Sequence, residues 1–273
     1  MTHFTARPIH GAVWITGASS GIGRSVALAL AGKGFTVHAT ARSAGDLEAL
    51  AAESAKLSGR IVATPGDVTD PEAMAAIVDR IVADSGPLAL AIFNAGVFLP
   101  VAGEALEASR FRKTFDVNLM GVVNGLVPVV EAMKQAGQGQ IAIVSSVAGY
   151  SGLPSSAAYG ASKAALTNMA ESLKFDFDKL GIRIQVIHPG FVDTPATEKN
   201  PFEMPALMKV EDAAKRIVEG LAKDQFEITF PRRFTYVLKF LKMLPYPVYF
   251  WLMNKATGWK DRPLETTKED GKT

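Results

Sequence analysis

The stretch from Ala12 to Gly23 reads AVWITGASSGIG, an apolar, β-branched run followed directly by a glycine-rich segment. We expect Ala12–Thr16 to form a strand and a helix, Gly21–Ala31, to begin inside the glycine-rich segment. Glycines allow positive φ angles and close approach of backbone to a ligand, and a helix N-terminus offers unpaired N–H groups and partial positive charge. This combination suits a pyrophosphate. A purely structural turn is the alternative, and the strand–loop–helix context disfavours it.

Outward from this stretch, short β-branched runs alternate with Ala- and Leu-rich segments of helical length. The expected strands are Ala12–Thr16, Phe35–Ala41, Arg60–Thr64, Leu88–Phe93, Gln140–Ser145 and Arg183–His188. The expected helices are Gly21–Ala31, Asp46–Leu57, Pro71–Asp84 with Asp70 as N-cap, Phe115–Gln135, Ala157–Leu180 and Val210–Lys223. Such βαβ alternation predicts a single α/β domain with a parallel sheet, and a reversal of strand order after the third strand makes it doubly wound and Rossmann-type, with three α/β/α layers.

Composition excludes several classes of protein. A chain of 273 residues suits one such domain, and its net charge of +2 gives no footprint for nucleic acid. There is no cysteine for disulfides or thiolate chemistry, and the four scattered histidines give no metal-ligand spacing, so we predict no metal. The sequence has no signal-peptide pattern and no apolar run of about 20 residues, so we expect a cytoplasmic protein without a transmembrane span.

The end of the second expected strand indicates which dinucleotide binds. An NAD site usually places a carboxylate there to bond the ribose 2′-hydroxyl. Here the strand continues into Ala41-Arg42-Ser43, without an acidic residue and with a guanidinium that suits a 2′-phosphate. We therefore predict NADP (NADPH) rather than NAD. The alternative is that Arg42 is a surface residue without a ligand.

Tyr159 and Lys163 lie four residues apart at the start of the second long helix, on one helix face. A free phenol has a pKa of about 10, which a neighbouring ammonium or an oxidised nicotinamide lowers. Such a phenol can donate a proton to a carbonyl or accept one from an alcohol. Ser146 ends the preceding strand, where a hydroxyl faces the ligand crevice and can bond the reacting oxygen. Ser145 fits local capping better.

Together these motifs resemble the short-chain dehydrogenase/reductase family of NAD(P)-dependent oxidoreductases, over at least Gly11–Phe230. The motifs that carry the resemblance, in the family's order and spacing, are TGASSGIG (Thr16–Gly23), Asp67-Val68, NAG (Asn94–Gly96), Asn118, Ser146, Tyr159 with Lys163, and PGFVDT (Pro189–Thr194). One position departs from the pattern: many NADP-using relatives have a basic residue where this chain has Ser20. The prediction of NADP therefore rests mainly on Arg42.

The resemblance implies a role for each motif residue. Tyr159 would be the acid/base, and Ser146 would orient the carbonyl. Lys163 would lower the tyrosine pKa and hold the nicotinamide ribose, and Asn118 would support a water-linked proton relay. The implied cofactor-binding residues are Gly17, Ser19, Ser20, Gly21, Ile22, Gly23, Arg42, Asp67, Val68, Asn94, Ala95, Gly96, Tyr159, Lys163, Pro189, Gly190, Val192 and Thr194. Taken singly, residues such as Asn118 and Asp67 are more often structural, bonding local backbone or capping a turn.

The function implied is hydride transfer between nicotinamide C4 and a carbonyl or secondary alcohol. Two alternatives stay open: the same fold with epimerase or dehydratase chemistry, and a catalytically idle NADP-binding regulator. The intact trio of Ser146, Tyr159 and Lys163 disfavours the regulator.

The substrate side is expected to be apolar. Its predicted residues are Ser146, Tyr159, Phe98, Tyr150, Phe191 and Met204, with Leu153, Phe202 and Met208 nearby. No Arg or Lys is evident among these walls to clamp a carboxylate or phosphate. We therefore expect a small, apolar carbonyl or alcohol as substrate.

Residues 231–273 are expected to form a helical and aromatic C-terminal extension of the predicted catalytic domain, 1–230, packed on that domain or on a partner subunit. They end in a charged tail that we expect to be frayed. Pro231–Lys260 interleaves aromatic and basic side chains. A lid over the substrate site or a dimer contact is favoured for it, and peripheral contact with anionic lipid is the third option. By resemblance, the two long helices are the expected contact surfaces of a homodimer or homotetramer.

Overall fold

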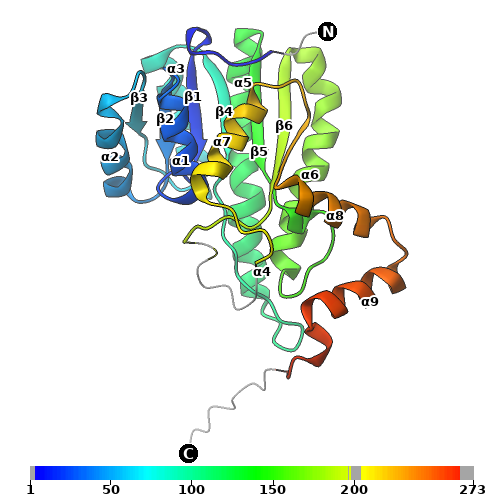
Figure 1. Cartoon of the computed structure of the whole chain (residues 1–273). Coiled ribbons are helices and arrows are strands. Elements are labelled where there is room, and N and C mark those ends of the chain that lie inside the picture. The colour runs from blue at the N-terminus through cyan, green and yellow to red at the C-terminus, as the bar shows by residue number, and fades with distance from the viewer. Residues whose placement is uncertain (1–3, 196, 198–203, 265–273) are drawn as a thin grey trace, which may run out of the picture.

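The computed structural model describes residues 4–195, 197 and 204–264. Its centre is a seven-stranded sheet in the order β3-β2-β1-β4-β5-β6-β7, with every neighbouring pair parallel (Figure 1). The strands are β1 (Ala12–Thr16), β2 (Thr36–Thr40), β3 (Arg60–Ala63), β4 (Leu88–Phe93), β5 (Gly139–Val144), β6 (Ile182–Pro189) and β7 (Glu227–Phe230). The strand order reverses between β3 and β4, which confirms the doubly wound, Rossmann-type fold predicted from the sequence.

Helices cover both faces of the sheet. The α-helices of the described chain are α1 (Gly21–Ala31), α2 (Ala44–Glu53), α3 (Pro71–Ser85), α4 (Ala108–Phe115), α5 (Gly121–Ala136), α6 (Ala157–Phe177), α7 (Val210–Leu221), α8 (Arg232–Lys242) and α9 (Tyr246–Thr257). Apolar residues of α1, α2 and α7 pack on one face, and those of α3, α5 and α6 pack on the other. Strands β1, β4, β5 and β6 are accordingly buried at every position, as expected for parallel strands covered on both faces, whereas the edge strands β3 and β7 are partly exposed.

Local sequence explains where the elements begin. The side chain of Asp70 accepts hydrogen bonds of 3.0 Å from the backbone N–H groups of Glu72 and Ala73, so it caps α3 as expected. At the contact of α5 with the sheet, Gly125 lies so near Phe93 and Trp14 that an added Cβ would be 2.7 Å from the first ring and 3.0 Å from the second. This glycine sets the distance between helix and sheet.

The structure differs from the expected elements in three places. β7 was not anticipated. The helix expected at Phe115–Gln135 begins earlier, at Ala108, and contains a π-helical turn, Asp116–Met120, between α4 and α5. By length and composition the continuous helix Ala108–Ala136 is apolar enough to cross a membrane, but in this fold α5 packs on the sheet as a core helix.

We call residues 231–264 the C-terminal arm; it comprises α8, α9 and a 3-10 turn, Trp259–Asp261. Leu238 of α8 is buried against Val147 and Tyr150. Tyr249 of α9 is buried and donates a hydrogen bond of 2.5 Å to the carbonyl of Gly152. The arm thus packs on the segment that follows β5.

Candidate active site

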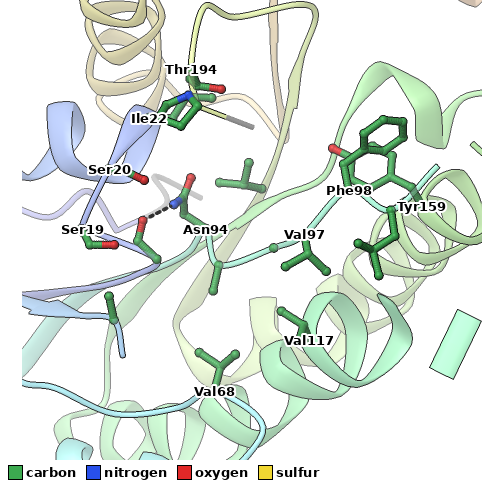
Figure 2. A pocket seen from close by; sticks show the side chains of 18 of the residues that line it. Ser19, Ser20, Ile22, Val68, Asn94, Val97, Phe98, Val117, Tyr159 and Thr194 are labelled. Carbon is green, nitrogen blue, oxygen red and sulfur yellow. Dashed lines mark hydrogen bonds between the residues drawn. The ribbon is translucent and has the colours of Figure 1, made fainter. Parts of the chain in front are cut away.

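A cavity of about 1180 Å³ opens at the carboxyl ends of the strands, where the strand order reverses. This is the place where open α/β sheets bind ligands. Most predicted site residues line it: Gly17, Ser19, Ser20, Gly21, Ile22, Arg42, Asp67, Val68, Asn94, Ala95, Gly96, Phe98, Ser146, Tyr159, Lys163, Pro189, Gly190, Val192 and Thr194. Figure 2 shows part of this lining, with Ser19 and Ser20 at one end and Tyr159 at the other. Its lining residues come from the carboxyl ends of β1, β2, β4, β5 and β6 and from the segments that follow these strands.

The glycine-rich loop leaves room that a side chain would fill. Gly17 has a φ of +66°, and a Cβ there would lie 2.6 Å from the Cα of Ala95. A Cβ on Gly23 would lie 2.3 Å from the carbonyl oxygen of Gly17, so Gly23 permits packing of the loop although it does not itself line the cavity. Ser20, the N-cap of α1, makes no side-chain capping hydrogen bond, so its hydroxyl leaves the first-turn N–H groups free.

Asn94 fastens the end of β4 to this loop. Its side-chain amide donates to the carbonyls of Thr16 (3.2 Å) and Gly17 (2.9 Å), and its backbone N–H donates to the Thr16 hydroxyl (3.1 Å). Asn94 therefore shapes the loop with its side chain and borders the cavity (Figure 2).

Arg42 and Asp67 line the end of the cavity that lies beyond β2 and β3. Asp67 accepts two hydrogen bonds from Thr69, from the backbone at 3.0 Å and from the hydroxyl at 2.9 Å. Those bonds, with the charge of Arg42, lower the pKa of Asp67. Asp67 is thus the turn cap that the sequence left as an alternative, and it also borders the cavity. Arg42 is exposed at the wall, whereas Arg24 pairs with Glu53 outside it.

Tyr159 and Lys163 project from the first turns of α6. The ammonium of Lys163 is buried, donates a hydrogen bond of 2.7 Å to the carbonyl of Val144 at the end of β5, and lies 5.6 Å from the centre of the Tyr159 ring. The Tyr159 ring packs edge-on against Phe98, with ring centres 5.2 Å apart (Figure 2). Burial lowers the pKa of Lys163 to about 8.

The direction of the tyrosine pKa is opposite to the one expected. Burial of the hydroxyl raises the pKa of Tyr159, although the ring borders the cavity and the residue as a whole is half-buried. A hydrogen bond with Ser146 opposes that rise. The sequence shows only that an ammonium is near, not that the phenol is desolvated, and desolvation is the larger effect here.

The two adjacent serines have different surroundings. The Ser145 hydroxyl donates to the carbonyl of Lys163 at 2.8 Å and lies 3.1 Å from the Thr167 hydroxyl. The Ser146 hydroxyl accepts from the backbone N–H of Ala148 at 3.2 Å and bonds to Tyr159. Ser145 therefore braces α6 against β5, and Ser146 is the serine that meets the tyrosine.

Asn118 lies in the π-helical turn and is fully buried, outside the cavity lining. Its amide oxygen accepts from the backbone N–H of Val97 at 2.7 Å, and its amide nitrogen donates to the Val97 carbonyl (3.0 Å) and to the Ser162 hydroxyl (3.2 Å). The side chain therefore clamps the segment after β4 to α6. π-Helical turns often occur at functional sites.

Three residues expected at the substrate side, all of them described, do not line the cavity: Tyr150, Phe191 and Met204. The Tyr150 hydroxyl donates to Glu227 at 2.6 Å, and its ring packs on His188. The Phe191 ring packs on Phe234 of α8. Phe202, also expected nearby, lies outside the described residues. Aromatic residues in irregular segments were assigned to the pocket by sequence position, but their side chains point under the C-terminal arm.

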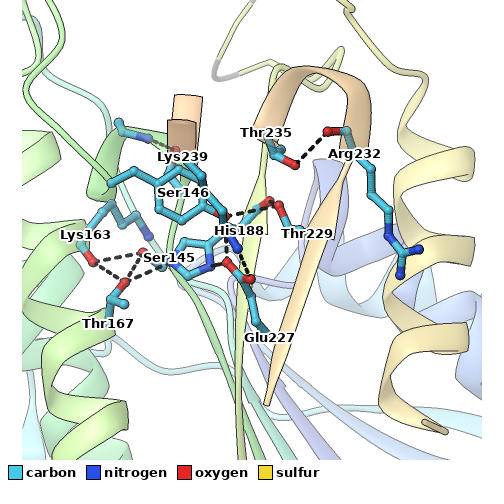
Figure 3. Close-up of polar contacts among 12 residues, drawn as sticks. Ser145, Ser146, Lys163, Thr167, His188, Glu227, Thr229, Arg232, Thr235 and Lys239 are labelled. Atoms are coloured by element: carbon cyan, nitrogen blue, oxygen red, sulfur yellow. Dashed lines mark hydrogen bonds and ion pairs between the residues drawn. The ribbon is translucent and has the colours of Figure 1, made fainter. Parts of the chain in front are cut away.

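Tyr150 instead belongs to a polar cluster beside the active site (Figure 3). Glu227 of β7 forms an ion pair with Lys239 of α8, and its carboxylate lies 2.9 Å from Nδ1 of His188. Nε2 of His188 lies 3.0 Å from the Thr167 hydroxyl. Burial favours a higher pKa for Glu227, but the hydrogen bonds from His188, Lys239 and Tyr150 outweigh it and lower the pKa to about 2. The cluster ties α8 to the sheet edge.

Sequence reasoning missed part of the cavity wall. The unpredicted lining residues include Ala41, Ser43, Asp46, Gly66, Thr69, Val97, Ser109, Arg112, Lys113, Asp116, Val117, Met120 and Val144. Arg112 and Lys113 correct the expectation that no basic side chain stands at the walls. They come from α4, which lies before the expected start of the helix at Phe115, so no motif indicated that they border the cavity.

Comparison with known proteins bears on this geometry. The family model described as short chain dehydrogenase matches residues 11–204. The chain belongs to the short-chain dehydrogenase family. It is therefore an oxidoreductase of the class that acts on alcohol or carbonyl groups with NAD(P). The glycine cradle, the free first turn of α1 and the long cavity fit a dinucleotide.

Individual members of the short-chain dehydrogenase family are similar to this chain over most of its length. An uncharacterized oxidoreductase of Myxococcus xanthus is 36% identical over 235 residues, covering 86% of this chain and 93% of that protein. A cyclohexanol dehydrogenase of an Acinetobacter strain is 35% identical, covering 66% and 72%. The crystal structure of a 3-ketoacyl-ACP reductase from Sinorhizobium meliloti superposes with a TM-score of 0.71 at 30% identity, covering 80% and 96%.

Proposed function

We propose that this protein is an NADP(H)-dependent oxidoreductase that transfers a hydride between nicotinamide C4 and a carbonyl or secondary alcohol, with Tyr159 as acid/base. One observation carries the proposal: Ser146, Tyr159 and Lys163 border the same cavity as the glycine-rich loop. When bound, the dinucleotide supplies the hydride or accepts it. The chain's own residues have to orient the reacting oxygen and move its proton.

Each of the three side chains has a distinct task. Tyr159 donates a proton to the carbonyl oxygen in reduction and takes one from the alcohol in oxidation. Its raised pKa keeps the phenol protonated at neutral pH, which suits the donor role. Ser146 bonds the reacting oxygen as charge develops on it. Lys163, fixed by the Val144 carbonyl, holds the nicotinamide ribose and lowers the cost of forming a phenolate.

Asn118 is assigned to the proton relay through its backbone rather than its side chain. Both ends of its side-chain amide are already engaged with Val97 and Ser162. A relay water therefore has to bond to the main chain of the π-helical turn. The remaining cofactor contacts are assigned to the residues that border the cavity, with Gly23 and Asn94 shaping the loop.

Substitution of the tyrosine tests the reaction. Tyr159→Phe removes the hydroxyl and is expected to lower turnover by about 10² to 10⁴ while NADPH still binds. Tyr236→Phe, at an exposed tyrosine of α8, is the matched control and should leave turnover unchanged. Unaltered turnover in Tyr159→Phe contradicts the proposal. Net oxidation of NADPH, one per product, separates it from epimerase or dehydratase chemistry, and NADPH binding without any turnover identifies a regulator.

Preference for NADP rests on Arg42, which borders the cavity, and on the sequence Ala41-Arg42-Ser43 after β2, which contains no acidic residue. Charge-assisted hydrogen bonds contribute roughly 1.5–3 kcal/mol, so Arg42→Ala should weaken NADPH binding by about ten- to 150-fold and leave NADH binding nearly unchanged. Arg24→Ala is the control, because Arg24 pairs with Glu53 outside the cavity. Equal losses for both cofactors in a calorimetric titration rule out this role.

An apolar substrate is supported by the side chains around Tyr159. Phe98, Val97 and Leu99 border the cavity near that tyrosine, and Val192 stands on the β6 side. One relative is named for cyclohexanol and one solved relative for a 3-ketoacyl group, both carbonyl or alcohol chemistry. A panel of cyclic, aliphatic and aromatic ketones set against small keto acids tests this class, and a preference for the charged acids counts against it.

We also propose that the protein is a homo-oligomer through its two long helices. Val127 of α5 and Phe175 of α6 are large apolar side chains that are mostly exposed in the single chain. Sedimentation velocity of Phe175→Glu against wild type is the test, and an unchanged monomer in both cases removes the proposal. A cytoplasmic location stays a prediction.

A further inference from the structure

The C-terminal arm exposes an apolar and aromatic surface that nothing in the described chain covers. On α8, Tyr236 and Val237 lie four and three residues before Phe240, so both neighbour it on the helix surface, and each of the three is more than half exposed. Met243, just after the helix, is 82% exposed. The opposite face of α8, with Leu238, is the one that packs on the domain.

The second helix of the arm continues this surface. Tyr246 and Phe250 stack on each other, with ring centres 6.1 Å apart, and both are exposed. Trp251 is 61% exposed, and the ammonium of Lys255 lies over its ring. Tyr249 alone among these aromatic residues is buried. Exposed aromatic residues on two successive helices mark a surface that meets a partner or a membrane.

The charge of the arm distinguishes these two occupants. Residues 231–264 contain seven Lys and Arg and a single acidic residue, Asp261, so the arm has a net charge of +6 in a chain whose net charge is +2. Lys239 and Arg262 pair with Glu227 and Glu104. The other five basic residues are exposed: Arg232, Arg233, Lys242, Lys255 and Lys260.

We propose that the C-terminal arm docks on the surface of an anionic lipid bilayer. Basic side chains bind anionic headgroups, while Tyr, Trp and Phe side chains enter the interfacial region. A second copy of the chain fits less well, because a symmetric contact through this surface sets two charges of +6 against each other. The short apolar runs, interrupted by Pro245 and Pro247, are suited to lying in the interface and not to crossing it.

The arm is placed to bring the active site near such a surface. Tyr249 bonds to Gly152 in the segment after Ser146, and Arg262 pairs with Glu104 in the segment after Phe98 and Leu99. Both segments leave the carboxyl edge of the sheet, and Figure 1 places α8 and α9 at that end, outside the three layers. A docked arm therefore sets the cavity mouth at the edge of the bilayer, where apolar compounds concentrate.

Vesicle flotation of the full-length protein tests the docking without cofactor or substrate, so its result is independent of the proposed reaction. We expect the protein to float with vesicles of phosphatidylcholine mixed with phosphatidylglycerol and much less with phosphatidylcholine alone, and added salt to weaken binding. Each basic residue near a membrane contributes about 1 kcal/mol, or roughly fivefold in partitioning. Arg233→Gln with Lys242→Gln should therefore reduce binding about 25-fold.

Matched variants make the test specific. Lys33→Gln with Lys56→Gln removes two exposed charges far from the arm and should not alter binding. Phe240→Ser with Trp251→Ser should abolish flotation, whereas Ile9→Ser, at an exposed apolar residue elsewhere, should not. Thermal unfolding verifies that each variant is folded. The proposal is overturned if the protein does not float, or if test and control variants reduce flotation equally. It is also overturned if the protein is an oligomer that Phe240→Ser with Trp251→Ser dissociates, and neither wild type nor variant binds vesicles.

Discussion

Replacing Lys163 by methionine is expected to stabilise the protein at neutral pH while it damages the proposed active site. Lys163 is 3% exposed, and burial lowers its pKa from 10.5 to about 8. In the unfolded chain the ammonium is hydrated at no such cost. Below pH 8 the folded protein therefore carries a buried charge that opposes folding.

The size of the effect follows from that difference in pKa. A drop from 10.5 to about 8 corresponds to about 3 kcal/mol at pH 7, with 1.36 kcal/mol for each pKa unit. Methionine is similar in length and removes this cost, but it also removes the hydrogen bond to the Val144 carbonyl, a loss of about 1 kcal/mol. The expected gain in unfolding free energy is thus about 2 kcal/mol, or roughly 4–8 °C in Tm.

Thermal unfolding of wild type and Lys163→Met between pH 7 and pH 10.5 measures this gain. The unfolded chain binds more protons than the folded one between pH 8 and 10.5, so wild-type stability rises with pH across that window relative to the variant. The advantage of methionine should therefore be full below pH 8 and disappear between pH 8 and 10.5. Above pH 10.5 only the lost hydrogen bond remains, so the variant should be about 1 kcal/mol less stable than wild type. A variant that is less stable at pH 7, or an advantage independent of pH, refutes the reasoning.

Two further changes address stability. The pKa of Glu227 is lowered from 4.5 to about 2, which contributes up to about 3 kcal/mol to the unfolding free energy. This contribution is present above pH 4.5 and is lost as the pH falls toward 2. Urea unfolding should therefore show that Glu227→Gln is less stable than wild type at pH 7 and that the difference disappears in acid. Gly125→Ala should cost about 1–3 kcal/mol by overpacking, whereas Gly103→Ala, where a Cβ meets open space, should be within about 0.5 kcal/mol of wild type; equal stability of the two variants contradicts the packing argument.

Regular elements were predictable because their sequence patterns are local. The strands from β1 to β6 are mostly short apolar or β-branched runs, and the glycine-rich loop at Gly17–Gly23 stands between a strand and a helix start. β7 has only four residues, Glu227–Phe230, so its alternation of buried and partly exposed positions is too short to identify a strand from the sequence. The π-helical turn at Asp116–Met120 depends on the packing of Asn118 against Val97 and Ser162, which are distant in sequence.

A site residue was predictable where its spacing within a helix determines the direction of its side chain. Residues in irregular segments, where sequence spacing does not determine that direction, were not predictable. Tyr159 and Lys163 share a helix face by their spacing, so their convergence follows from the sequence. Tyr150 follows a 3-10 turn, Val147–Gly149, and its direction is set by Glu227 of a strand that was not foreseen. The pKa of Tyr159 likewise depends on solvent access, which no motif encodes.

The oxygen that holds the Lys163 ammonium belongs to the peptide backbone of β5, at Val144, and not to a side chain. No point substitution can delete that acceptor, and the neighbouring strands β4 and β6 keep it in register. Side chains around the cavity are therefore free to diverge toward new substrates while the lysine anchor persists. Pocket side chains can therefore change without altering the position of the lysine that serves proton transfer.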